Sequence, residues 1–343
     1  MNAPEPAAPD ARPPALSMPE GGALFQRERA ASPQRGGGRR LRANSGLLTL
    51  KVQMPDSTPP FRRLGPDKPG RPVIVSVPHA GRAYSDGLLA SSRLSRARLE
   101  SLEDRLVDRL VWRAVEGGSV ALIADSPRAE IDLNRDEREL DPAMVLPRPA
   151  PDATVESPRT RGGLGLIPAR IAGSGAIWRQ RIAAAEVARR VEAIHRPYHA
   201  ALESELQAAK ARFGIAVLLD CHSMPPRGGE GEAPVVLGDR HGGSMAEALV
   251  AAAEGAARAA GFKVARNAPY AGGHITERHG RPALGIHALQ LELDRSLYLA
   301  PDLRTAGPGF DRVARLIAAI AEALAAEALA AAALDRPSAI AAE

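Results

Sequence analysis

From residue 71 onward, short apolar runs alternate with stretches in which apolar residues repeat at helical spacing. The apolar runs are rich in β-branched residues and bounded by turn residues, which predicts buried strands. These strands are expected at residues 72–77, 120–124, 215–219, 235–237, 262–265 and 288–293. The helical repeats predict helices at residues 99–115, 176–212, 245–260 and 310–334. Strands that alternate with helices imply right-handed crossovers, so the expected fold class is α/β, with a mixed, mostly parallel sheet flanked by helices.

Two segments lack such periodicity. Residues 1–68 are rich in Pro, Gly, Ala and Arg and keep neither a period of 2 nor one of 3.6. They are therefore expected to form a disordered N-terminal extension, and residues 69–335 a single folded domain. The second segment, residues 142–175, has many Pro and Gly residues, and an ordered loop of this length usually has a functional role.

The charge distribution changes this picture little. The formal net charge is +5, and six arginines between residues 27 and 42 contribute much of the excess. Such a run could contact nucleic acid or an anionic surface. It lacks interleaved aromatic residues and any recognisable binding fold, which favours a solvated tail. We therefore expect no nucleic-acid partner.

Cysteine content and hydropathy indicate the compartment. Cys221 is the only cysteine, so an intramolecular disulfide is excluded and a reducing, cytoplasmic location is expected. We expect no apolar run to approach the roughly 20 residues that span a membrane. The patch at residues 47–52 is too short for the core of a signal peptide. We therefore expect no membrane association.

Two histidines stand where predicted strands end. His79 follows the first strand after one proline, and the strand 215–219 leads into Asp220-Cys221-His222-Ser223. Ligands of such folds bind beyond the carboxyl ends of the strands, so the two imidazoles can converge on one ion, and imidazole suits zinc. Asp220 would share a strand face with His222 and could fix its tautomer. Taken singly, a hydrogen-bonded loop histidine or a capping aspartate is the ordinary alternative.

A catalytic zinc usually has three protein ligands and an open position, so a carboxylate is wanted. The predicted helix 99–115 offers Glu103, within its apolar face, and Asp104, at the edge of that face. A charge that faces a core needs a partner. Both residues could instead be acids of the first helical turn, favoured by the helix dipole. The choice between them stays open.

Two further polar groups suggest substrate binding and proton transfer. Asn134 and Arg135 end the run Ile131-Asp132-Leu133-Asn134-Arg135, and an arginine can bind a planar carboxylate through two parallel hydrogen bonds. Glu292 lies on the polar face of an alternating strand, where it could act as general base to a metal-bound water. The alternatives are an ordinary surface turn and a solvent-facing glutamate.

Six short motifs, in this order along the chain, carry a resemblance to a known family. They are the strand followed by Pro78-His79-Ala80-Gly81, Asp104-x-x-Val107-Asp108-Arg109-Leu110, Ile131-Asp132-Leu133-Asn134-Arg135, Asp220-Cys221-His222-Ser223-Met224, Gly272-Gly273-His274-Ile275-Thr276 and Gln290-Leu291-Glu292-Leu293. Over roughly residues 70–300 the chain thereby resembles the N-formylglutamate amidohydrolases. The resemblance implies a zinc-carboxypeptidase/phosphorylase-like fold with one zinc ion per chain, held by two histidines and a carboxylate.

The resemblance also implies roles for individual residues: His79, Asp104 and His222 as metal ligands, Glu292 as general base, and Arg135 as the group that grips the substrate carboxylate. The chain departs from the pattern twice. Arg82 stands where carboxypeptidase-like enzymes often have their carboxylate ligand, so the third ligand must come from elsewhere, and Asp104 against Glu103 stays open. His274 replaces an aromatic residue that is common in relatives, which would alter the acyl pocket.

The expected activity is zinc-dependent hydrolysis of a small N-acyl amino acid, N-formyl-L-glutamate, to formate and L-glutamate. Asn134, Arg161, His274 and Arg295 are further candidates for substrate binding, and Arg161 lies in a glycine-rich loop that could close over the substrate. The alternatives are hydrolysis of another N-acyl amino acid or peptide, or a non-catalytic binding or regulatory protein on the same fold.

Overall fold

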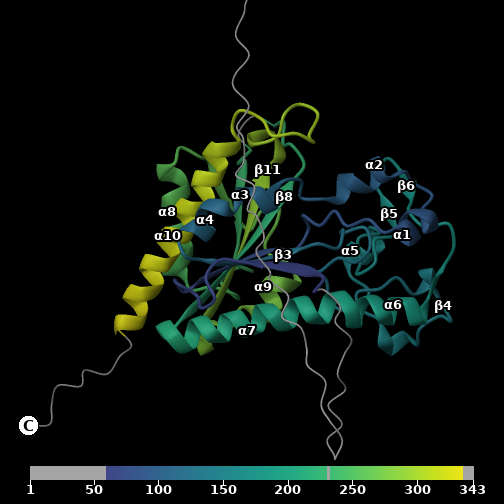
Figure 1. Ribbon diagram of the computed structural model, residues 1–343, viewed down its shortest axis with the longest axis horizontal. Helices are drawn as coiled ribbons and strands as arrows, with labels where there is room; N and C mark the ends of the chain where they lie inside the picture. Colours follow the sequence, from purple (N-terminus) through teal and green to yellow (C-terminus); the bar gives the residue numbers. More distant parts are fainter. Residues whose placement is uncertain (1–58, 230–231, 335–343) are drawn as a thin grey trace, which may run out of the picture. The chain divides into compact units, whose positions relative to one another are not determined.

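A seven-stranded sheet forms the centre of the protein. The computed structural model describes residues 59–229 and 232–334. The strand order of the main sheet is β1-β3-β2-β8-β11-β9-β10 (Figure 1). The strands are β1 (Phe61–Leu64), β2 (Val73–Val77), β3 (Val120–Ala124), β8 (Ala216–Met224), β9 (Val235–Gly238), β10 (Val264–Arg266) and β11 (Ile286–Asp294). Strands β3, β2, β8 and β11 are parallel neighbours, whereas β1 and β9 pair antiparallel with β3 and β11.

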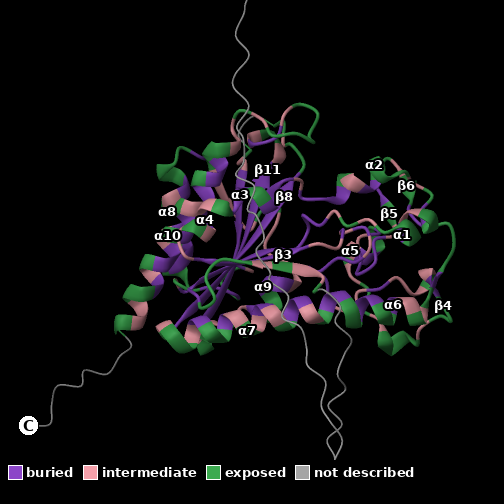
Figure 2. Ribbon diagram, in the orientation of Figure 1, coloured by how far each residue is buried: buried purple, intermediate pink, exposed green. Residues whose placement is uncertain are grey.

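Apolar side chains cover both faces of this sheet. In β2 every residue is buried, with Val73, Val75 and Val77 in one core cluster and Ile74 in the other. Strands that are buried on both sides read as continuous apolar runs, which is why the sequence identified them (Figure 2). The predicted mixed, mostly parallel sheet flanked by helices is confirmed.

Helices pack on both faces. The first core cluster includes residues of α3 (Val107–Leu110), α4 (Trp112–Glu116), α8 (Glu247–Ala259) and α10 (Phe310–Leu334). The second includes residues of α7 (Arg196–Phe213) and α9 (His274–His279), which lie along the opposite side in Figure 1. The sheet is thus the middle of three layers, and its carboxyl ends are left for the loops.

Much of the segment between β3 and α7 forms short elements beside the sheet (Figure 1). Within it, β4 pairs with β7 and β5 pairs with β6. The smaller elements of the chain are α1 (Asp86–Ser91), α2 (Arg96–Leu99), η1 (Glu100–Leu102), η2 (Pro142–Met144), β4 (Val145–Leu146), η3 (Pro151–Ala153), α5 (Pro158–Arg161), β5 (Arg170–Ile171), β6 (Gly175–Ala176), β7 (Ile182–Ala183), α6 (Ala184–Arg190), the π-helical turn η4 (Val191–His195), η5 (Pro282–Leu284) and η6 (Arg295–Leu297).

The predicted N-terminal extension ends earlier than residue 68. Residues 1–58 of it lie outside the described residues, but Phe61–Leu64 form β1 at the edge of the sheet, antiparallel to β3. Two of its four residues are arginines: Arg62 pairs with Asp125 at 2.8 Å and Arg63 with Glu205 at 2.7 Å. An edge strand with so many charges does not have the apolar run by which the buried strands were recognised.

The predicted helix 99–115 is wrong as a continuous helix. It is interrupted at residues 103–106, between η1 and α3, and Leu106 has a left-handed backbone with φ of 63°. Asp104 therefore lies in extended or turn-like chain rather than on a helix face, and its backbone N–H donates to the carbonyl of His79 at 2.9 Å. The apolar spacing of the leucines concealed this break.

Two other element boundaries differ from the prediction, and one short helix was not predicted. The helix expected over residues 176–212 begins at Ala184, because the preceding residues form β6, β7 and turns. Strand β8 runs on to Met224, so Asp220 and His222 lie within the strand rather than after it. Helix α9 (His274–His279) was not predicted, because six residues are too few to show a helical period.

Helix α10 has the predicted bounds, but the expectation that no apolar run approaches the length of a membrane span is wrong for it. Among the described residues it is the one helix that could cross a membrane by length and composition, with 25 residues and a mean hydropathy of 1.8. One such helix is weak evidence for a span. Nine of its residues are buried in the core, and it packs against α8 and α4. Its position is that of a packing helix.

We predict that Gly81→Ala destabilises the protein by about 1–3 kcal/mol, the usual cost of overpacking. A Cβ at Gly81 would overlap the backbone of Ser126 and Asp125, which follow β3. The matched control is Gly87→Ala on α1, where a Cβ meets open space, and a helical alanine should be neutral or stabilise by about 0.5–1 kcal/mol. Urea unfolding measures both, and equal stability of the two variants would contradict the close approach.

Candidate functional site

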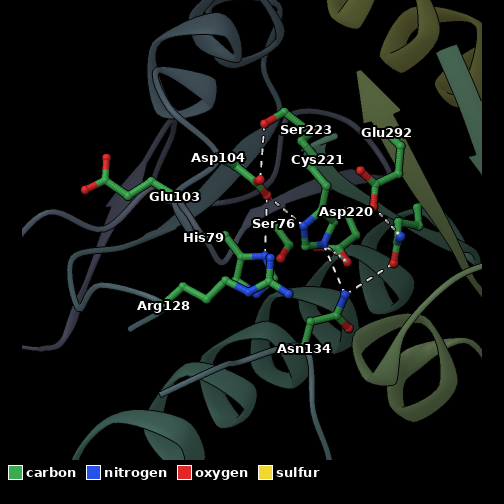
Figure 3. Close-up of polar contacts among 12 residues, drawn as sticks. Ser76, His79, Glu103, Asp104, Arg128, Asn134, Asp220, Cys221, Ser223 and Glu292 are labelled. Atoms are coloured by element: carbon green, nitrogen blue, oxygen red, sulfur yellow. Dashed lines mark hydrogen bonds and ion pairs between the residues drawn. The ribbon is translucent and has the colours of Figure 1, made fainter. Parts of the chain in front are cut away.

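Three buried side chains converge at the carboxyl ends of β2 and β8. The Nδ1 atom of His79 lies 3.4 Å from Oδ2 of Asp104, and Nδ1 of His222 lies 3.0 Å from the same oxygen. One atom from each residue lies within 4.8 Å of the others. All three side chains are at most 3% exposed, and Figure 3 shows the contacts of Asp104 with His79 and Ser223. The structure thus brings together the three predicted metal ligands.

Other groups fix the orientation of the Asp104 carboxylate. Its Oδ1 atom accepts a hydrogen bond from the Ser223 hydroxyl at 3.1 Å and lies 3.3 Å from Nη2 of Arg295. The same guanidinium nitrogen donates to the backbone carbonyl of Glu103 at 2.7 Å. These contacts hold Oδ1 outside the cluster and leave Oδ2 facing the two imidazoles.

A carboxylate contacts the Nε2 atom of each imidazole, on the side of the ring away from Asp104. Nε2 of His79 lies 2.7 Å from Oδ1 of Asp132, and Nε2 of His222 lies 2.9 Å from Oδ2 of Asp220. An ionised carboxylate only accepts, so each Nε2 carries a proton, and with a bound ion each Nδ1 would present its lone pair to that ion. The predicted partnership of Asp220 with His222 has the expected geometry. The role of Asp132 was missed, although it lies in one of the quoted motifs.

The cluster favours positive charge. Burial alone would raise the pKa of Asp104, but the close contacts with His222 and His79 lower it well below its usual value. Burial would lower the pKa of His222, but Asp220 and Asp104 raise it well above its usual value. Within the described residues, the buried Nδ1 of His79 has no hydrogen-bond partner. Two imidazole nitrogens and one carboxylate oxygen are a donor set that fits zinc.

The neighbouring carboxylate, Glu103, has a different environment. It accepts a hydrogen bond from the Tyr84 hydroxyl at 2.9 Å and pairs with Arg105 at 2.7 Å. Figure 3 shows its side chain directed away from the histidines. The alternative left open by the sequence is therefore decided by geometry: Asp104 reaches the imidazoles and Glu103 does not.

Glu292 lies on β11, opposite His222 in the register of β11 with β8. Its side chain is buried, and Oε1 accepts a hydrogen bond from Nε2 of Gln290 at 2.9 Å. Burial raises the pKa of Glu292 to about 7, His222 opposes the rise, and the negative charge of Asp104 adds to it. The residue is not a solvent-facing glutamate, and its pKa near neutrality is the value that suits a general base.

A cavity of about 320 Å³ opens onto this cluster. The three predicted ligands line one part of this cavity, and four arginines, Arg128, Arg135, Arg159 and Arg295, contribute to its walls. The residues with side-chain charge or hydrogen-bonding groups that line it include His79, Asp104, Arg128, Asn134, Arg135, Arg159, His222, Ser223, Tyr270, Gln290, Glu292 and Arg295.

Of the predicted substrate-binding residues, Asn134, Arg135 and Arg295 line this cavity. Nε of Arg135 donates to the carbonyl of Leu164 at 2.8 Å, whereas its buried Nη2 has no hydrogen-bond partner among the described residues. Nδ2 of Asn134 lies 3.2 Å from Nε2 of His222. These residues connect the histidine cluster with the walls of the cavity.

Arg161 does not lie in this cavity. Its side chain is 58% exposed, lies 3.7 Å from Glu156, and lines a separate cavity. Residues two apart on a helical turn point to different sides. On α5, Arg159 therefore lines the cavity beside the histidine cluster in place of Arg161. Sequence reasoning missed Arg159 and Arg128, because arginines are common in this chain and neither stands in a distinctive pattern.

His274 does not line the cavity either. It begins α9, and its ring lies 6.0 Å from that of His195 and 5.4 Å from that of His199, measured between centroids. Burial lowers the pKa of His274 to about 4, with His195 adding to the effect. The expected role of His274 in the acyl pocket therefore has no support from its position.

The family model of N-formylglutamate amidohydrolase matches residues 71–299. The N-formylglutamate deformylase of Pseudomonas putida is 33% identical over 235 residues, covering 66% of this chain and 82% of the relative. That of Pseudomonas aeruginosa is 33% identical over 240 residues, covering 68% and 84%.

Solved structures of similar proteins point to the same family. The crystal structure of N-formylglutamate amidohydrolase from Ralstonia eutropha JMP134 is 33% identical and superposes with a TM-score of 0.71, covering 81% of this chain and 98% of that one. A gene product of Agrobacterium tumefaciens, 19% identical with a TM-score of 0.57, shares the fold. The resemblance inferred from the six motifs is confirmed, and the chain belongs to the N-formylglutamate amidohydrolase family.

Proposed function

We propose that the protein is a metal-dependent hydrolase that converts N-formyl-L-glutamate and water to formate and L-glutamate, with Zn²⁺ as the ion. The observation that carries the proposal is the convergence of His79, Asp104 and His222 beside Glu292, in a cavity lined with arginines. Membership of an amidohydrolase family disfavours a purely binding or regulatory role.

His79, Asp104 and His222 would hold the ion through two nitrogens and one oxygen. When bound, such an ion lowers the pKa of a water molecule to about 7 and polarises the amide carbonyl. Asp132 and Asp220 hold the remote nitrogens of the two imidazoles and so keep the ligating nitrogens in place.

Glu292 carries the proton transfer in this proposal. In its ionised form it takes a proton from the water that adds to the formyl carbon, and then gives that proton to the leaving amine nitrogen. A carboxyl group with a pKa of about 7 can both accept and release a proton near neutral pH. Gln290 holds one carboxylate oxygen of Glu292 and limits its rotation.

The arginines account for an anionic substrate. Arg128 uses Nε to bind Asp132 at 2.9 Å, and its remaining N–H groups are available to an oxyanion formed from the formyl oxygen. Arg135 and Arg159 supply positive charge for the two carboxylates of the substrate. Burial lowers the pKa of Arg135 to about 10, and a bound carboxylate would offset this loss of hydration.

The names of the two Pseudomonas relatives support formyl as the acyl group and glutamate as the amino acid. Another N-acyl amino acid or a peptide is the alternative substrate, which a panel of N-formyl and N-acetyl amino acids would distinguish. The buried, unpaired thiol of Cys221 accords with the proposed cytoplasmic location.

We predict that Asp104→Asn loses one equivalent of bound zinc per chain and most of its activity. An amide oxygen is a much weaker zinc ligand than a carboxylate, and the charge that faces both imidazoles is lost. Glu103→Gln is the matched control and should keep its zinc, because Glu103 faces Tyr84 and Arg105. Elemental analysis of both purified variants measures this, and loss of zinc from Glu103→Gln alone would reverse the assignment.

Glu292→Gln should lower kcat by about 10²–10⁴-fold, the usual contribution of general acid–base catalysis, while the zinc content stays unchanged. Glutamine is nearly isosteric and can keep a hydrogen bond with Gln290, but it cannot accept the proton. Steady-state kinetics and elemental analysis of the same preparation test this. Full activity would remove Glu292 from the mechanism, and loss of zinc would make it a ligand.

Arg159→Gln should raise KM for N-formyl-L-glutamate by about 10–100-fold, because a hydrogen bond to a charged group contributes about 1.5–3 kcal/mol. Arg161→Gln, two residues away, is the control and should leave KM unchanged, since it lines a different cavity. Steady-state kinetics of the two variants decide the matter. An effect confined to Arg161→Gln would restore the residue that the sequence suggested.

A further inference from the structure

A second cluster of histidines lies outside the cavity. His195 ends the π-helical turn η4, His199 follows one turn later in α7, and His274 begins α9. One nitrogen from each ring lies within 4.8 Å of the others. We propose that these three residues form a second metal site, for Zn²⁺ or a divalent ion of similar ligand preference, separate from the site at His79 and His222.

The spacing along the chain supports a shared ligand. His195 and His199 are four residues apart on one continuous helical segment, so both rings project from the same face. Histidines at this spacing are a common way for a helix to offer two nitrogens to one zinc ion. The pair would be weak evidence alone, but His274 adds a third ring from a different element.

Hydrogen bonds fix which nitrogen of each helical histidine is available. Nε2 of His195 lies 2.9 Å from the carbonyl oxygen of Arg135, and Nε2 of His199 lies 3.0 Å from that of Leu133. A carbonyl oxygen only accepts, so both Nε2 atoms carry the proton and both Nδ1 atoms keep a lone pair. Donation of the remote N–H to a backbone carbonyl is the usual arrangement of a metal-binding histidine.

The ring positions fit an ion between them. Ring centroids are separated by 4.4 Å for His195 and His199, 5.4 Å for His199 and His274, and 6.0 Å for His195 and His274. Three imidazoles that bind one zinc ion tetrahedrally, at Zn–N distances of about 2.0–2.1 Å, have centroids roughly 5 Å apart. The observed separations bracket this value.

A purely hydrogen-bonded histidine network explains the cluster less well. Nε2 of His279 lies 3.0 Å from Nδ1 of His199, and an ion bound by that nitrogen would take the place of this contact. Within the described residues, however, Nδ1 of His195 and Nε2 of His274 are buried and have no hydrogen-bond partner. Leaving such a group unsatisfied costs about 1–3 kcal/mol. One ion would satisfy both nitrogens together.

The charge around the cluster is mixed, because the cation of Arg278 acts on the three imidazoles and a carboxylate lies beside His195. Oε1 of Glu137 lies 3.6 Å from Nδ1 of His195, close enough for this carboxylate to complete the coordination or balance the charge. Arg196 donates to both oxygens of Glu137, from Nε to Oε1 at 3.0 Å and from Nη2 to Oε2 at 2.8 Å, and keeps the carboxylate in position.

His195 and His199 donate to the backbone carbonyls of Arg135 and Leu133, the two neighbours of Asn134 in the chain. The side chain of Asn134 contacts His222 and Gln290. An ion that fixes the two imidazoles would therefore brace the segment that carries Asn134 and Arg135. This is the position of a structural ion, and its existence does not depend on the proposed reaction.

The test is the zinc content of the folded full-length chain. Wild-type protein is stripped with a chelator, reconstituted with Zn²⁺, passed through a desalting column and analysed for zinc per chain. His274→Gln should bind one equivalent less than wild type, whereas His274→Cys, which restores a zinc ligand, should recover it. His241→Asn is the control: His241 is exposed, and asparagine tolerates its positive φ of 55° better than most residues other than glycine.

Equal zinc content in wild type and His274→Gln would overturn the proposal. Failure of the catalytic site is distinguishable, because then Asp104→Asn would keep the wild-type zinc content while His274→Gln still lost one equivalent. If His274→Gln is not recovered folded, Asp104→Asn decides instead. Lacking the other site, it should still bind one Zn²⁺ and melt at a higher temperature with Zn²⁺ than without, and the absence of both effects would refute the second site.

Discussion

The shared contact of two imidazoles with one oxygen of Asp104 is the constraint on which the site depends. Three carboxylates, those of Asp104, Asp132 and Asp220, are fully or almost fully buried around His79 and His222. Buried charges of one sign are costly unless they are compensated. The two imidazoles, with Arg128 and Arg295, compensate part of this charge, and a bound cation would compensate more.

The fold positions this cluster by combining rigid strands with one irregular connection. His222 and Glu292 lie on neighbouring parallel strands whose register places them opposite each other. Asp104 arrives from the interruption between η1 and α3, where Leu106 has a left-handed backbone. Such a conformation costs of order 1–3 kcal/mol. It persists because Leu106 is buried and the backbone of Asp104 is hydrogen-bonded to His79, so the surrounding packing holds the carboxylate in place.

The sequence predicted what depends on local pattern. Strands β2, β3, β8 and β11 are buried on both faces, so their apolar runs located them and placed His79 and His222 at one edge of the sheet. The pairing of Asp220 with His222 followed from a period of two. The choice of Asp104 over Glu103 did not follow, because the leucine spacing predicted a helix where the chain turns.

Other features depend on contacts between distant segments, which local pattern does not encode. Asp132 is 53 residues from its partner His79 along the chain. On the short helix α5, Arg159 and not Arg161 lines the cavity, and this depends on how the helix is oriented against the rest of the fold. His274 was read within a motif, as part of the acyl pocket, although its ring packs with histidines from α7 and the preceding turn. Edge strand β1 was missed because charged residues interrupt it.

The central claim is that His79, Asp104 and His222 bind a zinc ion. Anomalous diffraction from a crystal of the zinc-reconstituted protein, recorded on both sides of the zinc absorption edge, tests it most directly. The account predicts an anomalous peak bounded by Nδ1 of His79, Oδ2 of Asp104 and Nδ1 of His222, beside Glu292. A crystal that shows no zinc peak among these three atoms would contradict it.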